Sequence, residues 1–449
     1  MEYAVQLFER GREGNASSTP LVCYASTMVS VNGIFQDDNL LDYTFPLFIF
    51  QVMIILLTNR ITAAILRPLR QPRYISEILG GFILGPTVMG RIPNFATTVF
   101  PYRSLVVLES MSYLGLVFFI FIVGIEIEID VVRRVGRRSV LVTAACLIGP
   151  AIIGTIAGIT LHGRLQAGTD RGSFVTFLCC VFSVTAFSVL ARILGELKLV
   201  ASDVGRLALS SSMITDGVAW VLLVYSIALS QSRGNAASAF WAVMSGGVFS
   251  VFVFAVVRPA SRWVMKRTPE GEEVAELYVC VMLVGAMVAA LMADVIGTHA
   301  IFGAFVYGLA VPNGPLGELL IEKIGDFIEG LLLPLFFAIS GFRTNLQNIV
   351  DYGAAGILLL VVTAAAATKV AGGVAAAFYM DLPLHDGISL GLLMNTKGLV
   401  ELIILNIGWD KKVRIYCMQF SFSFVVSFYE KKILGSTAHL LIAESYTYE

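Results

Sequence analysis

Long apolar runs separated by short polar segments make up most of the chain. An α-helix needs ~20 apolar residues to cross a bilayer, and it satisfies its own backbone hydrogen bonds there. The runs have this helical length and lack the ten-residue alternation of barrel strands. They predict about twelve membrane-spanning helices, at residues 45–66, 75–89, 105–125, 140–161, 174–194, 207–229, 240–257, 274–296, 300–311, 328–339, 355–378 and 388–407.

Composition supports an integral, multi-pass membrane protein. Hydrophobic residues make up 57% of the chain and charged residues 14%, against roughly 25% charged residues in soluble domains. The mean hydropathy is +0.81. The net charge is -1, and basic residues are scattered through short loops. That pattern excludes the concentrated basic surface that nucleic acid binding needs.

Loop charge indicates how the spans are oriented. Segments following the first, third, fifth and seventh spans carry roughly three times as many Lys and Arg residues as those following the second, fourth, sixth and eighth. Because Lys and Arg are enriched in cytoplasmic loops, the amino terminus is predicted to be non-cytoplasmic. Residues 1–42 are then a non-cytoplasmic segment, residues 43–412 a transmembrane domain, and 313–327 a mixed, slightly acidic loop.

A few ionisable residues fall inside these runs. A charged side chain at mid-membrane depth costs ~2.5 to 3.5 kcal/mol on insertion scales, so each one needs a partner or a function. Asp216 lies mid-span beside the hydroxyl of Thr215, Lys397 and Glu401 lie one helical turn apart, and Lys369 lies in another apolar run. Two structural alternatives stay open. Asp216 can form an ion pair with a lysine that only holds helices together, and Lys397 with Glu401 can form a local pair on one helix.

Two spans contain polar interruptions that predict discontinuous helices. One is the segment around Thr185, and the other is Asn395-Thr396-Lys397-Gly398. Interrupted helices offer half-helix ends and unwound backbone to an ion. Burial favours a protonated carboxyl group and a nearby cation favours an ionised one. A proton and a cation can therefore compete for Asp216, and exchange across the membrane would follow without ATP.

Motifs for other chemistry are missing from the sequence. It has no GxxxxGK[ST] phosphate loop and no HExxH motif, and its six cysteines have neither metal-ligand nor disulfide spacing. No nucleophile and base can be placed together. We therefore predict a protein that is not an enzyme and that uses no cofactor.

Extended segments resemble the plant cation/proton exchanger family, a branch of the monovalent cation:proton antiporters that includes Kef-type and NhaA-type exchangers. Residues 71–86, which begin QPRYISEILGG, resemble the signature of its second span. Further similar segments are 119–128, 185–199, 297–312, 334–341 and 395–408. The resemblance implies an all-α polytopic membrane protein. Its fold would be sodium/proton-antiporter-like, with inverted repeats, two crossing discontinuous helices, a panel domain and a moving core domain.

The resemblance also implies roles for residues. Asp216 would be the acidic residue that binds the cation or the proton, with Thr215 where some relatives carry a second acid or Asn. Thr185 would lie at one crossing, and Asn395, Thr396 and Lys397 at the other. Lys397 matches the plant pattern for a charge-tuning lysine, and Lys369 lies where bacterial relatives place theirs.

The transported ions, the membrane and the oligomeric state can also be inferred from the resemblance. The resemblance implies K+ as the main cation, with Na+ as the alternative, exchanged for H+ in an endomembrane or plasma membrane by a homodimer. Glu401 would change the expected electroneutral exchange if it took part. After Val413 the likeness is lost, and residues 413–449 form an atypical tail in place of a last span and a cytosolic domain. A channel, another solute carrier on the same scaffold and an inactive truncated product are alternatives.

Overall fold

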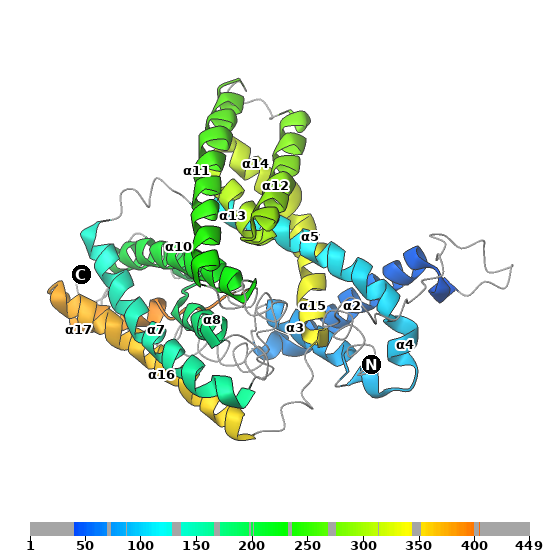
Figure 1. The fold of residues 1–449 in the computed structure, drawn as a ribbon, viewed down its shortest axis with the longest axis horizontal. Helices are drawn as coiled ribbons and strands as arrows, with labels where there is room; N and C mark the ends of the chain where they lie inside the picture. Colours follow the sequence, from blue (N-terminus) through cyan, green and yellow to red (C-terminus); the bar gives the residue numbers. More distant parts are fainter. Residues whose placement is uncertain are drawn as a thin grey trace. The chain divides into compact units, whose positions relative to one another are not determined.

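The computed structural model is built from helices throughout the residues that it describes. These are residues 40–69, 73–86, 88–127, 136–165, 171–196, 199–200, 202–231, 236–267, 275–312, 314–343, 352–398 and 404. Most of the predicted amino-terminal segment, the tail 413–449 and Glu401 lie outside these ranges. The described part contains no strand, so the all-α prediction is confirmed (Figure 1).

Eight helical stretches in the described ranges are long and apolar enough to cross a membrane. Seven of them are single helices: α2 (Thr44–Leu66), α5 (Tyr102–Glu126), α7 (Arg137–Leu165), α10 (Asp203–Gln231), α11 (Ala236–Arg267), α12 (Glu276–Ile296) and α16 (Tyr352–Tyr379). The eighth runs through α14 (Pro315–Phe327), the π-helical turn η5 (Ile328–Leu332) and α15 (Leu333–Arg343).

The other predicted spans coincide with shorter or broken helices. They are α3 (Arg73–Leu84), the pair α8 (Arg171–Ser183) and α9 (Phe187–Glu196), α13 (Ala300–Ala310) and α17 (Leu384–Leu393). The small elements η2 (Leu40–Asp42), η3 (Arg67–Leu69), η4 (Met89–Arg91) and α4 (Phe95–Val99) complete the described set. Every predicted span therefore contains a helix, and the multi-pass interpretation holds.

The prediction of a loop at residues 313–327 is wrong. Helix α14 begins at Pro315, a residue whose fixed φ suits the first helical position, and Gly314 precedes it. Buried Leu316 and Leu320 alternate with exposed Glu318 and Glu322 at helical spacing. The charged residues that suggested a loop therefore form one face of an amphipathic helix.

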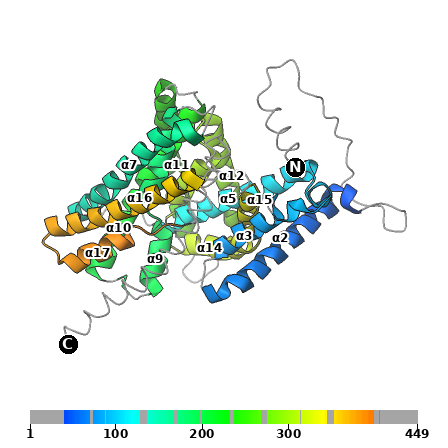
Figure 2. The same ribbon diagram turned by 90° about the horizontal axis from the view of Figure 1, so that it is seen from below.

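The chain divides into two compact units, the first comprising residues up to Phe119 together with Ile324–Asn348. In this unit α3 packs against α2 and α15, as Figures 1 and 2 show. Gly81 of α3 lies against the backbone of Ala338, and Gly341 of α15 lies against the backbone of Ile78. Glycine lets these helices approach until their backbones touch.

We expect Gly81→Ala to destabilise this packing. The added methyl group would overlap the backbone carbonyl of Ala338, and overpacking of this kind costs about 1–3 kcal/mol. The matched control is Gly356→Ala on α16, where a Cβ would meet open space. Thermal unfolding in detergent should show a lower midpoint for Gly81→Ala alone. Equal midpoints for the two variants would contradict the close approach.

The second unit comprises Ile120–Lys323 and residues from Ile349 onward. Within it α7 packs on α8 and on α16, α16 packs on α17, and α10 packs on α7 and α8 (Figures 1 and 2). Glycines again set the contacts, because Gly372 lies against the backbone of Ala145 and Gly373 against that of Gly391. Helices α8, α10, α16 and α17 therefore lie close together in this unit.

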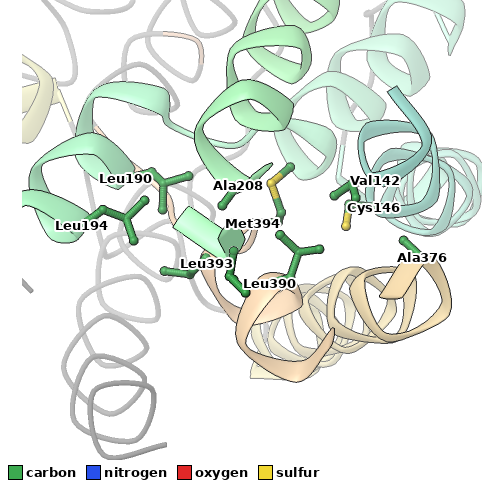
Figure 3. Close-up of a cluster of buried hydrophobic side chains, with 10 residues drawn as sticks. Val142, Cys146, Leu190, Leu194, Ala208, Ala376, Leu390, Leu393 and Met394 are labelled. Carbon is green, nitrogen blue, oxygen red and sulfur yellow. The ribbon is translucent and has the colours of Figure 1, made fainter. Parts of the chain in front are cut away.

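A hydrophobic cluster anchors the end of α17 in this unit. Figure 3 shows Leu390, Leu393 and Met394 beside side chains from α7, α9, α10 and α16. The partners are Val142, Cys146, Leu190, Leu194, Val204, Ala208 and Ala376. Because Met394 is fully buried, this packing fixes the point where the chain leaves α17.

Candidate functional site

The first discontinuous helix is the pair α8 and α9. Helix α8 ends at Ser183, the chain is non-helical over Val184, Thr185 and Ala186, and α9 begins at Phe187. All three linking residues are fully buried. A break at this depth exposes the carbonyl groups that end α8 and the N–H groups that begin α9, and both need partners.

The second interruption follows α17 and crosses the first. The chain turns at Met394 and Asn395 and is non-helical from Thr396 to Gly398, and Ile404 is helical again. The Ala186 N–H donates to the Thr396 carbonyl at 3.1 Å, and Thr185 Oγ1 donates to the Met394 carbonyl at 2.7 Å. The two predicted interruptions are therefore confirmed, and they contact each other directly.

Gly398 explains how the two segments come so close. A Cβ at Gly398 would meet the side chains of Val189 and Ala186 at less than ordinary contact distance. Only a residue without a side chain fits between the start of α9 and the second interruption. Within Asn395-Thr396-Lys397-Gly398, the Thr396 carbonyl accepts a hydrogen bond from the first interruption. Gly398 leaves room for the two segments to approach.

The side chain of Asp216 lies beside the first residue of α9. This side chain comes from the middle of α10 and is 7% exposed. Its Oδ2 atom accepts a hydrogen bond from the Phe187 N–H at 3.1 Å. The N-terminus of a helix carries a partial positive charge and free N–H groups, which stabilise an anion. The break in the helix thus supplies a partner for a carboxylate inside the protein.

Lys397 lies at the opposite side of the break, at the end of α8. Its ammonium group donates to the carbonyls of Val181 at 3.0 Å, Phe182 at 3.3 Å and Val184 at 2.6 Å. These carbonyls form the negative end of α8. The side chain is 9% exposed, so the helix end and the lysine stabilise each other away from water.

Lys369 reaches the same helix end from α16. Its ammonium group donates to the Val184 carbonyl at 2.6 Å and to Thr185 Oγ1 at 2.7 Å, and its side chain is 1% exposed. Both candidate lysines therefore contact the break, and they share the carbonyl of Val184. Thr185 connects Lys369 with the second interruption, because the Thr185 hydroxyl accepts from Lys369 and donates to the Met394 carbonyl.

The other predicted site residues are placed as follows. Thr215 is buried, and its hydroxyl donates to the Ser211 carbonyl at 2.9 Å. Thr396 is buried and donates to the Leu393 carbonyl at 3.0 Å, and Asn395 is partly buried. Both threonine oxygens keep lone pairs that can face a cation. Glu401 lies outside the described residues, so its predicted role stays a prediction.

The sequence predicts half-helix ends and unwound backbone at the two interruptions, but it does not identify which backbone groups contact the charged side chains. The Phe187 N–H and the carbonyls of Val181, Phe182 and Val184 belong to apolar residues, so no side chain in the sequence marks them. Only the position of the helix break could have identified them, because a break frees the groups on either side. The charged side chains of the site therefore bind mainly to backbone N–H and carbonyl groups.

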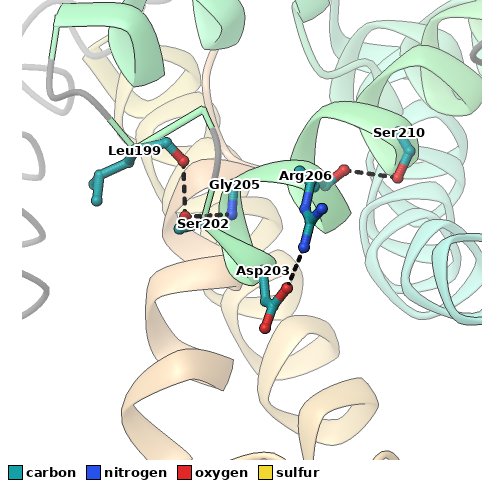
Figure 4. A network of polar contacts seen from close by, with 6 residues as sticks. All are labelled: Leu199, Ser202, Asp203, Gly205, Arg206 and Ser210. Carbon is teal, nitrogen blue, oxygen red and sulfur yellow. Dashed lines mark hydrogen bonds and ion pairs between the residues drawn. The ribbon is translucent and has the colours of Figure 1, made fainter.

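The amino-terminal end of α10 is polar and exposed (Figure 4). Ser202 Oγ accepts from the Gly205 N–H at 3.0 Å and caps the helix. Arg206 pairs with Asp203 at 2.6 Å, and this exposed pair contributes little to stability. The helix that carries Asp216 therefore begins at a solvated end and reaches the buried crossing farther along.

Fold and crossing together define an integral membrane protein with a sodium/proton-antiporter-like architecture. Residues 53–439 match the family model described as "Sodium/hydrogen exchanger, transmembrane". The chain therefore belongs to the sodium/hydrogen exchanger family.

Known relatives extend this assignment. The chain is 46% identical to Cation/H(+) antiporter 15 of Arabidopsis thaliana over 89% of its own length and 49% of that protein. It is 43% identical to Cation/H(+) antiporter 17 of the same plant over 87% of its length and 48% of the relative. The chain thus spans about half the length of these relatives.

A solved structure shares the fold. The sodium proton antiporter MjNhaP1 from Methanocaldococcus jannaschii superposes with a TM-score of 0.57, at 17% identity. The likeness covers 88% of this chain and 96% of that one. The predicted antiporter fold, with inverted repeats and two crossing discontinuous helices, is thereby confirmed.

Proposed function

We propose that the chain exchanges a monovalent cation for a proton by alternating access, with Asp216 as the group that binds each in turn. The observation that carries the proposal is the position of this buried carboxylate at the start of α9, opposite a second interrupted segment. Membership of the family and the names of the relatives support cation and proton as the two substrates.

The exchange follows from charge and burial. An ionised carboxylate inside the membrane is costly without a compensating charge. The Phe187 N–H supplies part of that compensation, and a proton or a cation supplies the rest. Empty Asp216 is then the least stable state during reorientation. One carboxylate carrying one proton or one cation gives an electroneutral exchange.

Oxygen atoms near the crossing would complete a cation site. Thr185, Thr215, Asn395 and Thr396 offer hydroxyl or amide oxygens, and the unwound backbone offers carbonyls. Such oxygen ligands replace the hydration shell of a monovalent cation. The resemblance to plant cation/proton exchangers favours K+ as the main cation, and Na+ is the alternative. Lys369 and Lys397 would hold the end of α8 and limit the positive charge that the site accepts.

The test is proton flux in proteoliposomes containing the purified chain. With a pH gradient imposed, added K+ should start proton movement, and the rate should not change when the membrane potential is set to different values. Na+ in place of K+ measures selectivity. A current that follows the membrane potential and ignores the pH gradient would instead identify a channel. No cation-dependent flux at any pH gradient would contradict the exchange.

A further inference from the structure

A stacked pair of aromatic rings lies one helical turn from Asp216. Trp220 of α10 packs on Phe305 of α13, with ring centroids 4.4 Å apart and an angle of 21° between the ring planes. Each side chain is 5% exposed. Because residues four apart lie on the same face of a helix, the Trp220 ring lies on the Asp216 face of α10. This aromatic pair binds neither the cation nor the proton in the proposed exchange.

The two sides of Asp216 along α10 differ in polarity. Toward Asp203, hydroxyl groups link α10 to α7. Ser139 and Ser210 hydroxyls lie 2.6 Å apart, the Thr143 hydroxyl donates to the Ser211 carbonyl at 3.0 Å, and the Ser211 hydroxyl donates to the Ser139 carbonyl at 3.2 Å. Toward Gln231 the buried side chains are mainly apolar: Ala219, Trp220, Leu223, Val224 and Ile227. Asp216 therefore lies between a part of α10 that forms polar contacts and a part whose buried side chains are mainly apolar.

The two rings are fixed to different helices. The Phe305 carbonyl lies against Gly124 of α5, and Gly303 of the same short helix lies against the Ala289 backbone of α12. Helix α10 is joined to α8, where Cys180 Sγ donates to the Ala219 carbonyl at 3.4 Å. A displacement of α10 and α8 relative to α13 would therefore separate the rings without unfolding either helix.

We propose that Trp220 and Phe305 form a gate that closes the path from Asp216 toward the carboxyl-terminal end of α10. This inference rests on the proposed exchange and adds the residues that seal one side of the site. An apolar constriction blocks ions because it excludes water. With the rings stacked, Asp216 communicates with the hydroxyl-rich side, which loop charge predicts to be cytoplasmic. When the rings part, it communicates with the other side.

A proton leak tests the gate. Liposomes containing Trp220→Ala or Phe305→Ala are given a pH gradient in a medium without alkali cations, with permeant thiocyanate to balance charge. A stacked aromatic pair is worth enough to change an open-to-closed ratio by up to about tenfold. We expect either variant to raise cation-independent proton flux by about that factor. The matched control is Trp241→Ala, which removes a 70% exposed ring of the Phe240 pair on α11 and should not leak.

The outcomes separate this inference from the exchange itself. A leak in both ring variants, absent from the unmodified chain and from Trp241→Ala, supports the gate whether or not K+ drives exchange. Failure of K+-driven flux in the unmodified chain contradicts the exchange alone. If Trp220→Ala and Phe305→Ala lower the thermal midpoint but stay as proton-tight as the unmodified chain, the rings are only packed core and the gate is wrong.

Discussion

Replacing Asp216 by Asn should reduce cation-driven proton flux by about 100-fold or more. The amide keeps the size and the hydrogen bond from the Phe187 N–H but carries no charge and binds no proton. Because the amide cannot take up or release a proton, no step of the exchange can carry one, and only the background leak of the liposomes remains. Proteoliposome flux at saturating K+ measures the loss.

Asp203→Asn is the matched control for this change. Asp203 lies on the same helix, but its side chain is 93% exposed and its pairing with Arg206 is at the surface. We expect its flux to stay within about twofold of the unmodified chain, because exposed pairs contribute little. Asp216→Asn with undiminished flux would show that another group binds the cation.

Lys397→Met should lower both stability and flux. Methionine has a similar length but donates no hydrogen bond, so the carbonyls of Val181 and Phe182 would lose a buried charged partner. An unsatisfied buried acceptor costs about 1–3 kcal/mol. In a chain of 449 residues a loss of this size lowers the midpoint of unfolding by about 1–3 °C. Flux should fall by about tenfold, since the end of α8 shapes the crossing.

Lys323→Met provides the comparison for this variant. Lys323 is exposed on α14, so its removal should leave the unfolding midpoint within about 0.5 °C. Thermal unfolding and flux are measured on the same preparations of both variants. A Lys397→Met protein with an unchanged midpoint would show that the ammonium group does not stabilise the end of α8.

Periodicity and length were sufficient to locate the membrane helices. Apolar runs predicted them because a bilayer constrains both composition and length. The two interruptions were also visible, since Thr185 and the segment Asn395-Thr396-Lys397-Gly398 place polar residues inside apolar runs. What failed was α14, where exposed charges on one helical face resembled a loop.

The detailed site could not be predicted from residue types. Asp216, Lys369 and Lys397 stood out because charge is rare in apolar runs, but their partners are backbone groups of apolar residues. Which lysine is the more important was left open by the sequence, and the contacts show both at the end of α8. Trp220 and Phe305 gave no sequence signal, because aromatic residues are common in apolar helices and only the fold brings these two together.

Competition between proton and cation at one carboxylate is the central claim, and proton release on cation binding tests it most directly. K+ is added to the purified chain in weakly buffered detergent solution while pH and bound cation are recorded. The account predicts proton release that accompanies K+ binding in the unmodified chain and in Asp203→Asn, and none in Asp216→Asn. Cation binding without proton release, or equal release from Asp216→Asn, would contradict it.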